Sequence, residues 1–155
     1  MRIQNKLGAI LRAKMVTLSV AESCTGGLTS HLITEVPGSS DYFLGGVVAY
    51  GNTAKLRPLG VSRQSLNRYG AVSATVARQM AVNVKKLFSA DYGMGITGIA
   101  GPGGGSSRKP VGLVFIAIAT PQKVLVRKFH FLGTRAEIKF SSAQRALNLL
   151  RLSLL

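Results

Sequence analysis

The segment from Ser19 to Gly27 holds the side chains best suited to chemistry. It reads Ser-Val-Ala-Glu-Ser-Cys-Thr-Gly-Gly and lies between an expected strand and an expected helix. A helix N-terminus offers free N–H groups and partial positive charge, which can hold an oxyanion or a phosphate. Ser23 is therefore a candidate nucleophile, with Cys24 as the competing one. Ordinary helix capping by Ser23 or Thr25 is the alternative interpretation.

A serine nucleophile needs a base, and a lysine is the best candidate. The chain has only two histidines, His31 and His130, and neither lies in a recognisable motif. Lys55 follows the apolar run Val47–Ala49, where burial could lower its pKa enough to give a neutral amine. A nearby Arg135 would lower that pKa further by charge repulsion. The alternative is a solvated surface lysine.

A glycine-rich loop extends from Thr97 to Gly105 and reads TGIAGPGGG. Glycines let backbone amides approach a ligand closely, as they do in phosphate-binding loops. The loop lacks the Lys-Ser or Lys-Thr ending of nucleoside-triphosphatase loops, and a simple turn is an equally good interpretation.

The composition predicts one domain over residues 1–155, with 46% hydrophobic residues and 18 glycines. The N-terminus does not resemble a secretory signal and no apolar run is long enough for a membrane span, so we expect a cytoplasmic protein. The single cysteine permits no internal disulfide, and the sequence predicts neither a metal site nor a cofactor.

The chain is strongly basic, with 20 Lys and Arg against five Asp and Glu and a net charge of +15. Such a field attracts polyanions and phosphorylated ligands. The bases are scattered, however, and they accompany no nucleic-acid-binding motif. We therefore expect no specific nucleic-acid partner, although a polyanion-binding protein stays an alternative.

Strand and helix patterns alternate along the chain. Strands are expected at 16–20, 46–50 (read as buried), 92–97, 111–119 and 124–131, and helices at 3–11, 28–33, 62–68, 73–87 and 136–150. This order predicts a three-layer α/β/α domain with a mixed sheet, the last pair of strands being antiparallel. Ligands of such folds bind beyond the ends of the central strands.

Five motifs together resemble the CinA C-terminal domain family. They are AESCTGG at 21–27, VPGSSDYFLGGVVAYGNTAK at 36–55, GAVS at 70–73, ADYGMGITGIAGPGGG at 90–105 and KPVG at 109–112. The chain departs from the family pattern at Gly51 and Thr53 and in the loop 106–108, where the family commonly has serine and acidic residues. None of these positions carries a chemical role assigned here.

The resemblance implies an amidohydrolase that converts nicotinamide mononucleotide to nicotinate mononucleotide and ammonia, without cofactor or metal. Ser23 would be the nucleophile, Lys55 the base, and Tyr50 a relay or positioning group. Substrate-binding roles would fall to Thr25, Gly26, Gly27, Thr97, Gly98, Gly101, Gly103 and Arg135. A homodimer is also implied. The alternative is an inactive nucleotide-binding relative, or a regulatory protein linked to competence or DNA damage.

Overall fold

The computed structural model describes residues 1–155 and contains one five-stranded sheet with strand order β2-β1-β3-β4-β5. The strands are β1 Leu18–Glu22, β2 Phe43–Val48, β3 Tyr92–Gly98, β4 Leu113–Ala119 and β5 Val124–His130. β1 runs parallel to both β2 and β3, whereas β4 is antiparallel to β3 and β5. The predicted mixed sheet is confirmed.

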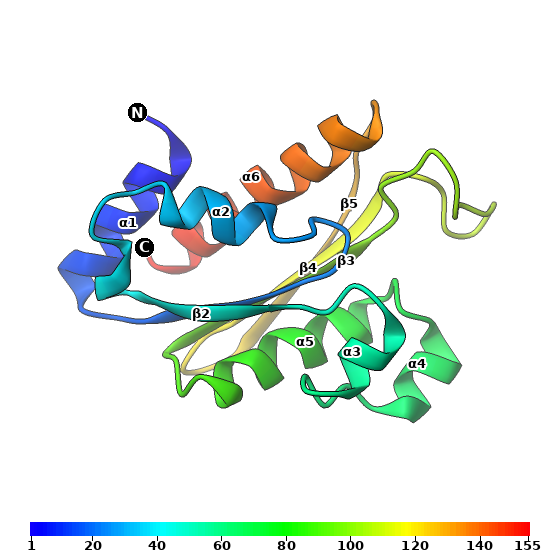
Figure 1. Ribbon diagram of the computed structural model, residues 1–155, viewed down its shortest axis with the longest axis horizontal. Coiled ribbons are helices and arrows are strands. Elements are labelled where there is room, and N and C mark those ends of the chain that lie inside the picture. The colour runs from blue at the N-terminus through cyan, green and yellow to red at the C-terminus, as the bar shows by residue number, and fades with distance from the viewer.

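Helices cover both faces of this sheet (Figure 1). One face carries α1 Ile3–Lys14, α2 Leu28–Thr34 and α6 Arg135–Ser153, and the other carries α3 Asn52–Leu56, α4 Arg63–Tyr69 and α5 Ala74–Leu87. A short 3-10 turn, η1 Ser39–Asp41, precedes β2. Separate apolar clusters fill the two sides, one around Leu7, Ile96 and Leu147 and the other around Val76 and Met80. The three-layer architecture is thus confirmed.

No helix is both long and apolar enough to cross a membrane.

Strand β2 differs from its prediction. It was expected at 46–50 as a buried strand, but it spans Phe43–Val48 at the sheet edge, and alternate residues are exposed. Val48, for example, is 52% exposed. An edge strand has a neighbour on one side only, so an apolar run does not by itself distinguish it from a central strand. The five-residue helix α3 was also missed, because so short a helix leaves almost no periodic signal.

Helix α5 packs unusually close to β3 because two glycines face it. A methyl group built on Gly93 would lie 2.1 Å from the Ala81 carbonyl oxygen, and one on Gly95 would lie 2.5 Å from the Ala77 carbonyl oxygen. Backbone therefore meets backbone at this contact, and any side chain at either position would push the helix away.

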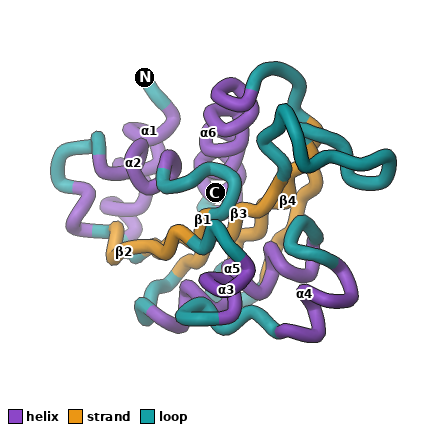
Figure 2. The backbone as a smooth tube through the Cα atoms, turned by 45° about the vertical axis from the view of Figure 1, so that its right-hand side comes forward, coloured by secondary structure: helices purple, strands orange, loops and turns teal.

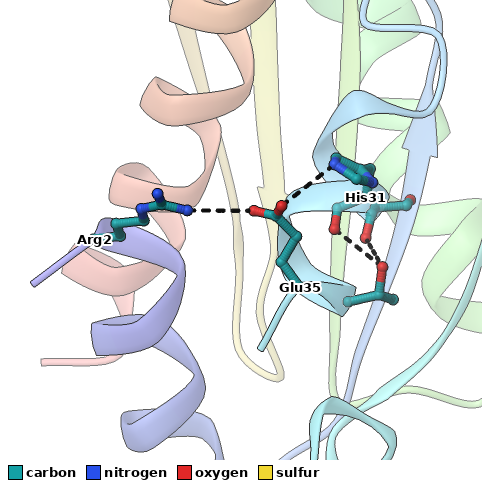
Figure 3. A network of polar contacts seen from close by, with 5 residues as sticks. Arg2, His31 and Glu35 are labelled. Carbon is teal, nitrogen blue, oxygen red and sulfur yellow. Dashed lines mark hydrogen bonds and ion pairs between the residues drawn. The ribbon is translucent and has the colours of Figure 1, made fainter. Parts of the chain in front are cut away.

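All five acidic side chains have structural partners. Glu35 lies between Arg2 and His31, with N–O distances of 3.8 and 3.6 Å, and so joins the start of α1 to α2 (Figure 3). The other four acids are Glu22 (bound to the α2 amides), Asp41 (paired with Arg12), Asp91 (bound to Thr17) and Glu137 (in the α6 capping box with Thr134).

Gly95→Ala should lower the free energy of unfolding by about 1–3 kcal/mol, because the added methyl group overpacks the contact between α5 and β3. Urea denaturation at constant slope measures this effect. Gly103→Ala is the matched control: no atom lies within 4 Å of the added methyl. A Gly95→Ala midpoint equal to that of the control would contradict the packing argument.

Candidate active site

Ser23 and Lys55 meet at the carboxyl end of the parallel strands. Ser23 directly follows β1, and Lys55 lies on α3, which begins shortly after the neighbouring strand β2. Lys55 Nζ lies 3.0 Å from Ser23 Oγ. Both residues are buried, with exposed fractions of 1% for Lys55 and 7% for Ser23. The surface-lysine alternative for Lys55 is therefore wrong.

The Lys55 amine is held by backbone oxygens rather than by a carboxylate. Nζ donates to the carbonyl oxygens of Ala49 at 2.9 Å and Tyr50 at 3.1 Å, and no acidic residue pairs with it. Burial lowers the pKa of Lys55, while the neighbouring Cys24 acts weakly in the opposite direction. Desolvation thus drives the shift, and the expected repulsion by Arg135 is not among its causes.

These three contacts suit a neutral amine. A neutral amine has two N–H bonds, which here can go to the carbonyl oxygens of Ala49 and Tyr50. Its lone pair is then left for the third neighbour, the Ser23 hydroxyl at 3.0 Å. A general base must come within about 2.6–3.2 Å of the proton donor, and this pair satisfies that condition.

Cys24 is a poor competitor as nucleophile. Its side chain is 5% exposed and packs in the apolar cluster on the α6 side of the sheet. Burial raises the pKa of the thiol to about 12, against weaker opposing contributions from a backbone hydrogen bond and nearby lysines. Since the thiolate is the reactive form, Cys24 is protonated and inert near neutral pH.

Glu22, which the sequence reasoning left without a role, fixes the turn that carries Ser23. Its buried carboxylate accepts hydrogen bonds from the backbone N–H of Thr29 at 2.9 Å and of Ser30 at 2.8 Å, and from the Ser30 hydroxyl at 2.7 Å. It thereby ties the end of β1 to the first turn of α2. In the sequence, the signal for this role of Glu22 is the position of an acidic residue shortly before the expected start of a helix.

The turn between β1 and α2 also contains free amides. The N–H groups of Cys24, Thr25 and Gly27 have no acceptor in the chain, whereas the Gly26 N–H donates to the Ser23 carbonyl at 3.0 Å. The Gly26 N–H is therefore engaged within the turn, and neither Gly26 nor Gly27 lines the cavity beside Ser23. The buried Thr25 hydroxyl has no partner and does not line the cavity beside Ser23.

A cavity of about 180 Å³ opens beside Ser23 and Lys55. It brings together six predicted residues: Ser23, Lys55, Tyr50, Thr97, Gly98 and Arg135. It is completed by Cys24, the competing nucleophile, and by four residues to which no role was assigned: Asn52, Ala71, Val72 and Ala100. Asn52, Ala71 and Val72 lie in the motifs at 36–55 and 70–73. Membership in these motifs is the only feature of the sequence that could have placed them at the site.

Thr97, Tyr50 and Arg135 are held by specific hydrogen bonds. The Thr97 hydroxyl donates to the Ala71 carbonyl oxygen at 2.9 Å. Arg135 donates to the Gly101 carbonyl oxygen at 2.6 Å and to the Tyr50 hydroxyl at 2.8 Å. The Tyr50 hydroxyl has no hydrogen bond to Ser23 or Lys55, so its carbonyl oxygen, and not its phenol, positions the amine.

The glycine-rich loop reaches the site only at its first residues. The segment between β3 and β4 extends well beyond the body of the protein (Figure 2). Gly101 is buried at its base and Gly103 is exposed, and neither of them lines the cavity. The structure therefore brings neither glycine into the cavity, although Gly101 accepts a hydrogen bond from the cavity residue Arg135.

The remaining candidates lie elsewhere. His31 pairs with Glu35, His130 contacts the Val111 carbonyl oxygen, and neither lines the cavity. No group of three or more His, Cys, Asp or Glu side chains could hold a metal ion. A larger hollow of about 520 Å³ lies at the opposite end of the sheet near Lys85 and Thr120, but no side chain there pairs a nucleophile with a base.

Known proteins resemble this chain over nearly its whole length. A CinA-like protein of Nostoc punctiforme is 51% identical over 152 residues, which cover 96% of this chain and 36% of the relative. The chain spans little more than a third of the curated relatives that it matches. The crystal structure of competence/damage inducible protein CihA from Agrobacterium tumefaciens has a TM-score of 0.92 and 38% identity, covering 99% of this chain and 96% of that one.

A competence-damaged protein (CinA) superfamily protein from Escherichia coli has a TM-score of 0.94 and 34% identity, with coverage of 99% of this chain and 88% of that one. The family model described as the CinA C-terminal domain matches residues 1–154. Sequence and fold therefore agree that this chain belongs to the CinA C-terminal domain family.

Proposed function

We propose that this protein hydrolyses the carboxamide of nicotinamide mononucleotide to nicotinate mononucleotide and ammonia. The observation that carries the proposal is the buried Lys55 amine, 3.0 Å from the Ser23 hydroxyl and without an acidic partner. Such a pair supplies the nucleophile and the general base that a serine–lysine amidohydrolase needs. The choice of substrate comes from the motif resemblance to nicotinamide-nucleotide amidohydrolases.

Acylation begins when Ser23 Oγ attacks the carboxamide carbon and Lys55 takes the hydroxyl proton. Among the free amides of the turn after β1, that of Cys24, which lines the cavity, is the candidate donor to the developing oxyanion. One such donor commonly lowers the barrier by about 3 kcal/mol. When the tetrahedral intermediate collapses, the C–N bond breaks, Lys55 returns the proton, and ammonia leaves.

Deacylation uses the same residues with water as the nucleophile. Lys55 takes a proton from water as the oxygen attacks the Ser23 ester, and then returns it to Ser23 Oγ as the ester bond breaks. Nicotinate mononucleotide is released, and the enzyme regains its starting protonation. Arg135 keeps Tyr50 and the Gly101 carbonyl in place around the cavity, acting as a positioning residue.

The wild-type protein should release equimolar ammonia and nicotinate mononucleotide from nicotinamide mononucleotide. Ser23→Ala should lower kcat by about four orders of magnitude or more, as for other serine hydrolases, with substrate binding retained. A coupled ammonia assay and calorimetric titration measure the two effects. A wild-type protein that binds the nucleotide without releasing ammonia would instead support the regulatory alternative.

The rate should rise with pH through an ionisation that belongs to Lys55. Because burial lowers the pKa of Lys55 below its ordinary value of 10.5, the neutral base is present at lower pH than for a solvated lysine. In a plot of kcat against pH, kcat should therefore increase with pH, and the midpoint of this increase should lie below 10.5. Lys55→Arg keeps the charge but removes the base, so it should cost about 10²–10⁴-fold.

Lys55→Arg activity near the wild-type level, with the increase of kcat with pH unchanged, would contradict the assignment of Lys55 as base. Lys55→Met is the companion variant, since it fills similar volume without a buried charge. It separates loss of the base from any disturbance caused by the bulkier guanidinium.

Cys24→Ala should keep kcat within roughly tenfold of wild type, and iodoacetamide should modify Cys24 only slowly, because the buried thiol stays protonated near neutral pH. Mass spectrometry follows the alkylation alongside the activity. A Cys24→Ala variant as inactive as Ser23→Ala would transfer the nucleophile to the cysteine.

A further inference from the structure

A second hollow shares the lining residue Arg135 with the catalytic cavity. Its volume is about 390 Å³, and it is lined by Leu28, Arg135, Ala136 and Lys139. Arg135 lines both spaces, so the two hollows meet at this residue. Arg135 and Lys139 are four residues apart on α6 and therefore share one face of that helix.

Lys139 is a half-buried cation without any polar partner. It takes part in no hydrogen bond and no ion pair. The nearest acid on its own helix, Glu137, is engaged by Thr134 in the capping box. Arg135, in contrast, already donates to Gly101 and Tyr50. Lys139 is thus the cation of this face that is free to bind a ligand.

Lys139 also lies against the turn that carries the nucleophile. A methyl group built on Gly26 would be 3.5 Å from Lys139 Nζ. Beside it, the N–H of Gly27 has no acceptor in the chain. The Lys139 ammonium therefore lines this hollow and lies next to the turn after β1, where it is a donor that suits an anion.

The catalytic cavity itself is too small for a whole nucleotide. Its volume of about 180 Å³ falls below the range of about 300–1,000 Å³ typical of small-molecule sites. If the pyridinium carboxamide occupies it, the sugar and its charged group must extend outside. The hollow that shares Arg135 with this cavity, and that contains an unpaired cation, is a space that could receive them.

We propose that Lys139 binds the phosphate of the substrate in this hollow and so makes the enzyme prefer the phosphorylated nucleotide over the unphosphorylated nucleoside. This inference rests on the proposed amidohydrolase function. It assigns the phosphate to Lys139 rather than to Arg135, whose guanidinium already donates to Gly101 and Tyr50. Lys139 is a substrate-binding residue that sets specificity and takes no part in proton transfer.

The test compares nicotinamide mononucleotide with nicotinamide riboside, which lacks only the phosphate. Lys139→Gln should lower kcat/KM for the mononucleotide by roughly tenfold or more and leave that for the riboside within about twofold, because only one substrate offers the contact. Lys139→Arg should restore most of the preference. Lys123→Gln is the control: it removes the same charge from an exposed lysine near the larger distant hollow, and should not change the ratio of the two substrates.

Equal losses for both substrates in Lys139→Gln, or an unchanged ratio, would overturn the inference. If the wild type turns over neither substrate, the proposed function fails, and the inference is then judged by binding. Calorimetric titration of Ser23→Ala and Ser23→Ala/Lys139→Gln with both compounds should show weaker binding of the mononucleotide only. Identical mononucleotide affinity in the two variants would refute the phosphate contact irrespective of catalysis.

Discussion

The burial of the Lys55 amine without a counter-ion is the constraint on which the rest of the site depends. Placing an ammonium in the interior is costly unless it is paired, and the chain gives this one only carbonyl oxygens and a hydroxyl. Release of the proton removes this unfavourable buried charge. The neutral amine that remains is the form that a general base requires. A carboxylate at the same place would stabilise the ammonium and remove the basicity. A chain with few acidic residues therefore suits a site in which the lysine amine must have no carboxylate beside it.

The turn after β1 must hold Ser23 still against this amine. Glu22 does so by crossing from the last residue of the strand to the first turn of α2, where it satisfies amides that would otherwise lack partners. Because that carboxylate is used at the helix start, it does not reach Lys55. One acid thus shapes the backbone around the nucleophile while leaving the base unpaired.

Most of the architecture could be predicted from the sequence because the strands and longer helices have strong periodicity. The Ser23–Lys55 pair was also predicted, since each follows a strand and the motifs supported both. What could not be predicted were features set by tertiary contacts. The edge position of β2 depends on which strands pair, and the roles of Glu22 and Lys139 depend on how α2 and α6 pack beside the turn. Likewise, the cavity excludes Gly103 because the loop extends outward, which its glycines alone do not specify.

Acidic and basic side chains differ in how many structural contacts they make, so the two kinds of charge differ in how freely they can be replaced. Each of the five acids holds a helix start, a turn or an ion pair, so replacing one removes a structural contact along with the charge. Basic residues such as Lys6, Lys14 and Lys86, by comparison, make no hydrogen bond or ion pair through their side chains. Replacing a basic residue at such a position should therefore change stability little, whereas replacing an acid such as Glu22 would leave backbone amides without their acceptor. The large positive charge is a property that selection could relax without rebuilding the fold.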